Sequence, residues 1–239
     1  MHILYFHQYF TTPSGSFGIR SYEMAQAAIS RGHKVTIVCG GDLRSGLDLP
    51  EIKPGLRHGE VDGIEIYQFT LPYPNQLSLF QRALIFLKYA IRSSQLALRL
   101  DYDLLFATST PLTAGIPGIA MKLARKRKKF IFEVRDLWPE LPKAMGVVKN
   151  PLLLWGMSLL EWASYRAADG CIGLAPGIVK GIQNRSRENL RIAMISNGCD
   201  LNLFKPKSRE GLALPGIGLN EFVAIFTGAH GMANGLESV

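Results

Sequence analysis

Short apolar runs alternate with longer segments of helical periodicity from the N-terminus onward. Residues 3–6 form a run typical of a buried strand, residues 19–31 repeat apolar positions at helical spacing, and residues 34–39 form a second apolar run. Gly32 ends the helix between the two runs. Two strands joined by one helix form a parallel βαβ unit with a right-handed crossover, so this part of the chain predicts an α/β fold.

The same alternation continues to residue 195 and predicts a doubly wound, mostly parallel sheet. The later predicted strands are residues 102–107, 130–134, 171–174 and 192–195, and the later predicted helices are residues 79–100, 111–126, 151–168 and 176–184. An Asp-Gly pair at Asp62 and Gly63, inside an alternating region, predicts a hairpin or a bulge rather than another helix-crossed strand.

The segment after residue 204 differs from the chain before it. Prolines and glycines in a polar stretch predict a linker over residues 205–220. Residues 221–228 then predict one more strand that ends in a glycine, and one strand cannot form a domain. We therefore expect a Rossmann-like domain over residues 1–204 and, over residues 221–239, the first strand and glycine-rich turn of a second, truncated domain.

Composition narrows the class of protein. Apolar residues make up 47% of the chain and charged residues 19%, which excludes a disordered or a fibrous protein. No uninterrupted apolar stretch reaches the roughly 18 residues of a membrane span, and the N-terminus lacks the features of a signal peptide. The three cysteines are an odd number in no metal-ligand spacing, so they favour buried hydrophobes in a reducing cytosol over a disulfide framework or a zinc site.

The positive charge of the chain is local. There are 27 basic and 19 acidic residues, and residues 79–129 alone hold ten basic and two acidic ones. A surface of that kind meets phosphate-rich partners such as anionic lipid or nucleic acid. The window lacks regularly interleaved aromatic residues and nucleic-acid motifs, so no nucleic acid partner is expected.

Within the predicted helix 79–100, an apolar face lies beside a basic flank. The apolar face consists of Phe80, Leu84, Leu87, Ile91 and Leu98, and the basic flank consists of Lys88, Arg92 and Arg99. Such a helix can rest in the headgroup layer of a membrane while its cations meet lipid phosphates. A core helix with a solvated edge has the same pattern, so both interpretations stay open.

The first strand-to-helix loop carries candidate chemistry at Gly15, Ser16 and Gly18. This loop precedes a helix and can collect backbone N–H groups for an anion or for sugar hydroxyls. It lacks the dinucleotide-binding fingerprint, and a tight turn that needs glycine is an equally good explanation.

Arg135, Asp136 and Glu140 follow a predicted buried strand, at the end where open α/β sheets bind ligands. A carboxylate there can accept a proton, and an arginine can hold a phosphate. The alternative is that Asp136 caps the following helix and pairs with Arg135. Further along, Asn197 and Gly198 form a turn at an interdomain edge, which is either a turn only or the border of a ligand cleft.

Five short motifs occur in a specific order along the chain. They are His7-Gln8-Tyr9-Phe10 with the glycine loop, residues 31–36, residues 135–140, Asn197-Gly198-Cys199-Asp200 and Phe226-Thr227-Gly228. In this order they resemble the group 1 retaining glycosyltransferases, and among them the WbuB-like branch of bacterial polysaccharide biosynthesis. The resemblance covers essentially the whole chain. It implies a GT-B fold, in which two Rossmann-like domains face each other across a cleft, with no metal and no cofactor.

The resemblance also implies an activity and a place in the cell. Relatives of this kind hold the acceptor mainly on the first domain and the nucleotide sugar mainly on the second. The implied reaction is transfer of a sugar, of the N-acetylated hexosamine type, from a UDP-sugar to a polyprenyl-diphosphate-linked acceptor with retention. Such enzymes build O-antigen and capsule, which implies a cytoplasmic protein bound peripherally to the inner face of the plasma membrane.

The resemblance assigns roles to the residues of the first domain. Gly15, Ser16 and Gly18 would approach the donor phosphate and the acceptor, and Asn197 and Gly198 would border the hinge. Arg135 stands where many relatives have a histidine, which leaves Asp136 as the better catalytic candidate and Glu140 as the next one.

The end of the chain departs from the pattern of the family. Relatives carry basic residues after the glycine that matches Gly228, where this chain has Ala229 and Asn234. Either Gly228, His230 and Gly231 bind the phosphates, or the grip lies in sequence that is missing, and the chain alone is expected to be inactive. Two other classes stay open, namely a non-catalytic domain that docks to a membrane or a partner, and a dinucleotide-dependent oxidoreductase.

Overall fold

The computed structural model of the chain describes residues 1–15, 18–41, 45–73, 77–124, 127–201, 204–206, 218, 221–228 and 235–236. Contacts within the chain divide it into two units, Met1–Ser196 and Asn197–Val239. The helices and strands described below belong to the first unit, and each unit is treated by itself.

Among the described residues, nine strands form one sheet in the order β3-β4-β5-β2-β1-β6-β7-β8-β9. The strands are β1 (His2–Phe6), β2 (Lys34–Gly41), β3 (Glu51–Lys53), β4 (Leu56–Val61), β5 (Ile64–Thr70), β6 (Leu104–Thr108), β7 (Lys129–Val134), β8 (Gly170–Gly173) and β9 (Arg191–Met194). Strand β4 runs antiparallel to β3 and β5, and the other neighbouring pairs are parallel. The predicted doubly wound, mostly parallel sheet is therefore confirmed.

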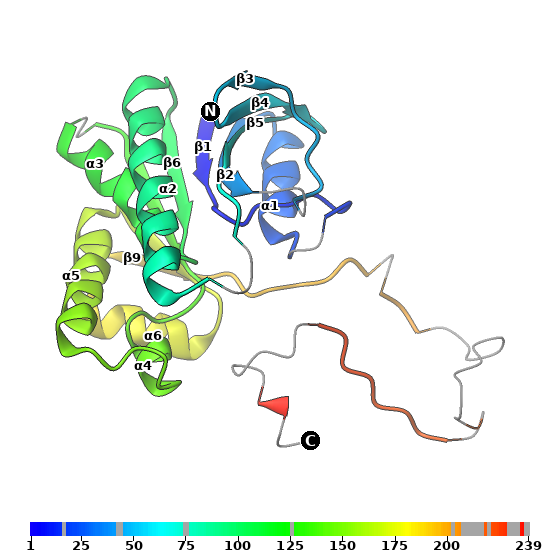
Figure 1. The fold of residues 1–239 in the computed structure, drawn as a ribbon, viewed down its shortest axis with the longest axis vertical. Coiled ribbons are helices and arrows are strands. Elements are labelled where there is room, and N and C mark those ends of the chain that lie inside the picture. The colour runs from blue at the N-terminus through cyan, green and yellow to red at the C-terminus, as the bar shows by residue number, and fades with distance from the viewer. Residues whose placement is uncertain are drawn as a thin grey trace. The chain divides into compact units, whose positions relative to one another are not determined.

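Helices cover both faces of this sheet. They are α1 (Arg20–Ile29), α2 (Leu79–Arg99), the 3₁₀ turn η2 (Leu112–Gly115), α3 (Ile116–Ala124), α4 (Glu140–Ala144), α5 (Pro151–Ala167) and α6 (Pro176–Arg185). Figure 1 shows α2, α3 and α5 as neighbours, and α3 contacts both of the others. Helices α2, α3 and α5 share one cluster of buried side chains, whereas α1 packs on a separate cluster.

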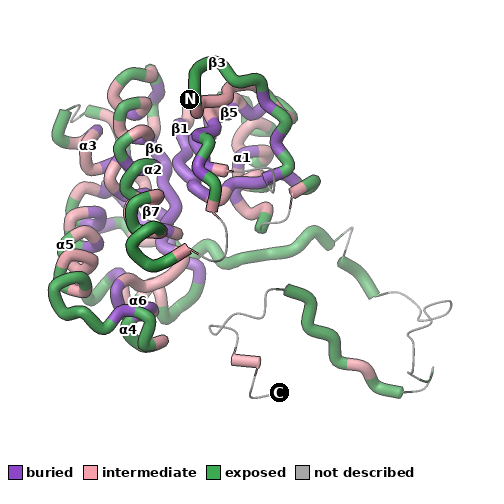
Figure 2. Tube along the Cα trace, in the orientation of Figure 1, coloured by how far each residue is buried: buried purple, intermediate pink, exposed green. Residues whose placement is uncertain are grey.

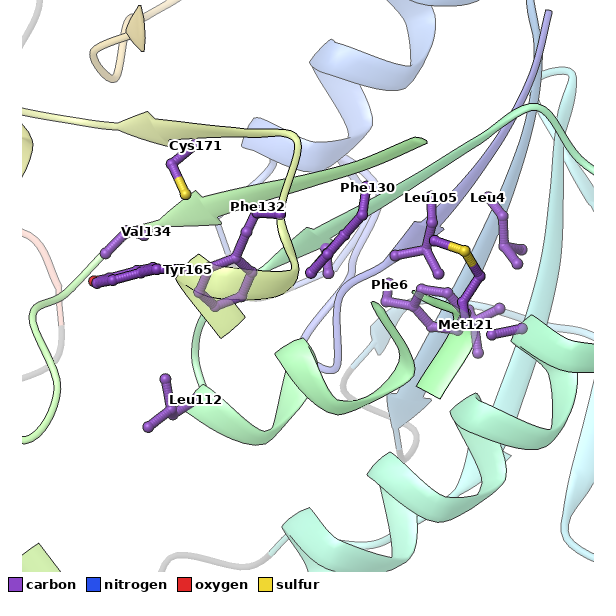
Figure 3. Packing of buried hydrophobic residues seen from close by; sticks show 14 of the residues in the cluster. Leu4, Phe6, Leu105, Leu112, Met121, Phe130, Phe132, Val134, Tyr165 and Cys171 are labelled. Atoms are coloured by element: carbon purple, nitrogen blue, oxygen red, sulfur yellow. The ribbon is translucent and has the colours of Figure 1, made fainter. Parts of the chain in front are cut away.

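The two clusters follow from the alternation of side chains along each strand. In β1, Leu4 and Phe6 join the cluster under α2, α3 and α5, whereas Tyr5 joins the cluster under α1. Figure 3 shows Phe6 near Met121 of α3, and Phe132 of β7 near Tyr165 of α5. Figure 2 shows the burial that results, with buried residues along the strands and exposed residues on the outer sides of the helices. A residue one step along a strand therefore belongs to a different core.

The predicted elements between residues 3 and 195 are confirmed within a few residues at their ends. The hairpin forms between β4 and β5, where Asp62 and Gly63 have φ of 52° and 78°, the positive values that a two-residue turn of this kind requires. The predicted helix 111–126 begins as the 3₁₀ turn η2 and becomes α-helical at Ile116. The hydrophobic pattern missed β3 and α4, because elements of three and five residues are too short to show a period.

The second unit contains no strand over residues 221–228, where the sequence predicts one. A β-strand exists only by pairing its backbone with a neighbour, and the described residues of this unit include no such neighbour. Phe222 is 95% exposed and Ile225 is also exposed. The predicted strand is therefore wrong for this structure, and the assignment of residues 221–239 to a second domain stays a prediction.

Candidate active site

The topology of the sheet places a crevice between β1 and β6. From β1 the chain moves through α1 to β2 on one side, and from β6 it moves through α3 to β7 on the other. Ligands of open α/β sheets bind at such a switch point, at the carboxyl ends of the strands. The residues that follow the strands there are His7 and Gln8 after β1, Ser109 and Thr110 after β6, and Arg135 and Asp136 after β7.

The loops after β6 and β7 are held together by hydrogen bonds. The strands end level, because Thr108 lies opposite Glu133 in the register. The backbone N–H of Arg135 donates to Ser109 Oγ over 2.9 Å, and Thr110 Oγ1 donates to Asp136 Oδ2 over 3.1 Å. The Asp136 carboxylate is thereby held at a set position at the edge of the sheet.

Asp136 is not a helix cap. Helix α4 begins at Glu140, its N-cap position is occupied by Pro139, and no side chain caps it. Among the described residues, Asp136 forms no ion pair with Arg135, and its Oδ1 has no partner. The capping hypothesis is wrong, and a half-buried carboxylate oxygen is left available for a ligand.

Thr110 holds its hydroxyl toward Asp136 from an unusual backbone conformation. Its φ is 113°, in a region that β-branched residues avoid. A residue in such a region costs about 1–3 kcal/mol and persists only where its surroundings hold it, often at functional sites. The strained residue thus points to the same part of the sheet edge as the topology does.

His7 and Gln8 bring two buried polar atoms to the same edge. The two side chains are 3% and 2% exposed, and His7 Nδ1 and Gln8 Oε1 have no hydrogen-bond partner in the described structure. Burial lowers the pKa of His7 to about 3, and the nearby Arg135 charge lowers it further. His7 is therefore neutral, and a hydroxyl that both donates and accepts hydrogen bonds would satisfy such atoms.

The depressed pKa of His7 predicts a pH dependence of folding. The folded chain keeps His7 neutral, whereas the unfolded chain gains a proton below about pH 6.5, so acid favours unfolding. Stability should fall as the pH drops from 6.5 toward 3. Between pH 7 and pH 5 this group accounts for a loss of about 2 kcal/mol. Denaturant unfolding should show this part of the loss in the wild type and not in His7→Gln, and equal losses in both would contradict the assignment.

A buried ion pair lies beneath the site. Arg20, at the start of α1, places Nη2 at 2.9 Å and Nε at 3.1 Å from Glu133 Oε1, and the Glu133 side chain is 0% exposed. Thr108 Oγ1 donates to the other carboxylate oxygen of Glu133. Arg20 also donates to the carbonyls of Ile195 and Ser196, each over 2.8 Å. One guanidinium thus joins the start of α1, the end of β7 and the chain that leaves β9.

Our sequence analysis did not predict Arg20, Glu133, Thr110, His7 or Gln8 as site residues. A signal was present for Glu133, which stands between Phe132 and Val134 in a strand predicted to be buried. A carboxylate in such a strand requires a buried cation as its partner. The sequence did not show which of the 27 basic residues would be that cation.

The other predicted site residues lie in different places. Glu140 is exposed and lies 3.9 Å from Arg185, away from the Thr110 contact that holds Asp136. Gly15 packs so closely that an added Cβ would lie 1.8 Å from Thr11 Oγ1, so the turn itself requires glycine there, whereas Gly18 is exposed and has open space. Asn197, Gly198 and Gly228 are exposed residues of the second unit, and Ser16, His230 and Gly231 lie outside the described residues.

The predicted basic flank of α2 is only partly a free surface. Lys88 and Arg99 are exposed. Arg92 instead donates to the carbonyl of Gly55 over 3.2 Å and lies over the ring of Phe69. The apolar face has the opposite outcome to a core helix, because four of its five residues face solvent: Phe80, Leu84, Leu87 and Ile91.

Metal and cavity chemistry add little to the site. In the part of the chain that the structure describes, no three His, Cys, Asp or Glu side chains gather as metal ligands, and no helix is long and apolar enough to cross a bilayer. Cys39 and Cys171 are buried, and burial raises the pKa of both thiols. A cavity of about 450 Å³ lies between α1 and the strands, and Arg191 is the one charged residue among those described that line it.

The fold and the polar strand ends define a Rossmann-like domain with a ligand site at the switch point. Residues 17–198 match the model of the Glycosyl transferase 4-like domain, and the chain belongs to that family. The fold is that of the N-terminal domain of GT-B glycosyltransferases. No curated protein sequence matches the chain.

Two solved structures illustrate the likeness in fold. Sucrose-phosphate synthase from Thermosynechococcus elongatus superposes with a TM-score of 0.63 at 13% identity, over 90% of this chain and 53% of the other. A trehalose-6-phosphate structure from E. coli with UDP-2-fluoro glucose bound superposes with a TM-score of 0.57 at 9% identity, over 85% of this chain and 50% of the other. The chain thus spans about half the length of each of these proteins.

Proposed function

We propose that this chain is the acceptor-side domain of a glycosyltransferase that transfers a sugar from a UDP-sugar to a lipid-linked saccharide. The observation that carries the proposal is the cluster of polar groups after β1, β6 and β7, in a chain of the Glycosyl transferase 4-like family. The unpartnered atoms of His7 and Gln8 suit the hydroxyls of a sugar, because a hydroxyl donates and accepts. The E. coli neighbour with UDP-2-fluoro glucose bound supports UDP as the carrier.

We assign Asp136 the central chemical role. Its carboxylate would accept the proton of the acceptor hydroxyl as that oxygen attacks the donor sugar, while Thr110 keeps it in place. Arg135 would face the donor phosphate, together with Gly15, Ser16 and Gly18 of the first loop. Glu140 is the second candidate for the base. Asn197 and Gly198 would border the hinge, and Gly228, His230 and Gly231 would contact the diphosphate.

The finer parts of the proposal concern stereochemistry, acceptor and location. We propose that the donor sugar is of the N-acetylated hexosamine type, that its configuration is retained, and that no metal takes part. The acceptor would be a polyprenyl-diphosphate-linked saccharide of bacterial O-antigen or capsule synthesis. Such an acceptor lies in a bilayer, so the protein would bind peripherally at the cytoplasmic face of the plasma membrane, with Lys88, Arg92 and Arg99 on the membrane side and no nucleic acid partner.

A transfer assay tests this function. A two-domain protein that contains this chain should move labelled sugar from a UDP-sugar to a short polyprenyl-diphosphate saccharide, and NMR of the product should show the anomeric configuration of the donor. The 239-residue chain alone should neither transfer nor hydrolyse the donor, because catalysis requires both substrates to be positioned. Saturable binding of NAD without transfer would favour an oxidoreductase, and vesicle binding without transfer would favour a docking domain.

A further inference from the structure

Helix α5 has its polar and apolar sides reversed. The side that faces the protein contains the buried residues Glu161, Ser164 and Tyr165. The opposite side contains Trp155 and Trp162, which are 63% and 52% exposed. Folded proteins in water place charge outside and large apolar side chains inside, so this arrangement requires an explanation.

The inward charge of α5 is satisfied within the protein. Glu161 lies 2.8 Å from Nε of Arg185 on α6 and accepts a hydrogen bond from Tyr165 over 3.0 Å. Burial raises the pKa of Glu161 to about 7, against the effect of Arg185. The helix thus keeps its one carboxylate out of its exposed surface.

The outward residues of α5 form a continuous stripe. Leu152, Trp155, Leu159 and Trp162 are spaced three and four residues apart, which places them on one side of the helix over about 15 Å. Arg166 is exposed and continues the same line at the end of the helix. We call these four apolar residues the α5 stripe.

Helix α2 carries a second stripe in the same layer of helices. Phe80, Leu84, Leu87 and Ile91 are exposed, with Phe80 at 78%, and Lys88 is exposed beside them. Helix α3 packs between α2 and α5 and adds the exposed Leu123. The outer surface of this layer therefore holds an unusual number of large apolar side chains for a protein surface in water.

The charges of this layer select the partner. The basic residues of α2, α3 and α5 are Arg82, Lys88, Arg92, Arg99, Lys122 and Arg166, and their single acidic residue is the buried Glu161. A second copy of the same surface would bring like charges together, which is unfavourable. The headgroup region of an anionic bilayer offers negative phosphates and an apolar layer below them, and tryptophan prefers that boundary.

We propose that the α5 stripe inserts into the headgroup region of an anionic bilayer, together with the α2 stripe, and that apolar contact rather than the basic flank of α2 provides most of the binding. The inference rests on the part of the proposed function that brings this domain to a membrane. It adds α5 as an anchor and removes Arg92 from the contact, since Arg92 packs against Gly55 and Phe69.

The tryptophans of the chain provide a direct probe. Two of the three tryptophans are in the α5 stripe, and the third, Trp138, has a buried Nε1. Vesicles of phosphatidylcholine with about one third phosphatidylglycerol should shift the emission of the purified chain to shorter wavelength, and brominated acyl chains should quench it. Trp155→Gln/Trp162→Gln should reduce vesicle pelleting by about tenfold with unchanged thermal unfolding.

Matched variants separate the contributions. Ile52→Gln removes a similarly exposed apolar residue from β3, outside the helical layer, and should pellet like the wild type. Lys88→Gln/Arg99→Gln should weaken pelleting by less than the tryptophan variant does and should reduce its salt dependence. A wild type that shows no shift and no quenching, pelleting unchanged by the tryptophan variant, or a dimer in lipid-free solution that the same variant dissociates would each overturn the proposal.

The vesicles contain no saccharide and the assay no nucleotide sugar, so the outcome does not depend on catalysis. Failure of vesicle binding with intact sugar transfer rejects the α5 anchor alone. Intact vesicle binding in a protein without transfer rejects the proposed function alone.

Discussion

Asp136→Asn in a two-domain protein that contains this chain is expected to fold, to bind the UDP-sugar and to lose a factor of about 10²–10⁴ in turnover. Asparagine keeps the size of the side chain and its carbonyl can still accept the hydrogen bond of Thr110. It cannot accept the proton of an attacking hydroxyl. The loss should therefore appear in kcat, with little change in the affinity for the donor, as measured by steady-state transfer and by donor titration.

Two comparisons give this result its meaning. Thr110→Val removes the hydroxyl that positions Asp136 and leaves the carboxylate, so it should lower turnover by less, about tenfold. Glu140→Gln changes a carboxylate that lies toward Arg185 and should leave most of the turnover if Asp136 is the base. Near-normal turnover in Asp136→Asn, combined with a large loss in Glu140→Gln, would transfer the role to Glu140.

Glu133→Ala is expected to destabilise the domain by about 3–5 kcal/mol, the cost typical of a buried ion pair that loses one partner. The Glu133 side chain is fully buried, and that of Arg20 is 12% exposed. Without the carboxylate, the guanidinium keeps only the carbonyls of Ile195 and Ser196 as partners. Denaturant unfolding of the 239-residue chain measures the loss, and hydrogen exchange should rise at Ile195 and Ser196.

The control for this prediction is an ion pair in water. Glu140→Gln breaks the 3.9 Å contact with Arg185, and exposed pairs of this kind contribute less than about 1 kcal/mol. The double variant Arg20→Met/Glu133→Leu removes both charges and should be more stable than Glu133→Ala, because no unpaired charge is buried. A loss in Glu133→Ala no larger than that in Glu140→Gln would show that the pair is not effectively buried.

The candidate site was predictable in position and only partly in membership. Arg135 and Asp136 follow a buried strand, and parallel strands bring their carboxyl ends to one edge, so sequence order alone places them there. His7 and Gln8 follow β1 in the same way and carried the same signal, which we used only as a family motif. The Thr110 contact and the strained φ of that residue depend on how two loops meet, and no pattern along the chain records such a meeting.

The sequence by itself determined the class of fold, the order of strands and helices up to residue 195, and the family, because hydrophobic periodicity and turn residues act locally. Only the tertiary structure decided which apolar faces are covered. The pattern of α2 and α5 is the same for a core helix and for a surface helix, and a face becomes exposed because no other element packs on it. The partner of Glu133 was decided in the same way, since residues 20 and 133 meet only when α1 and β7 share one sheet.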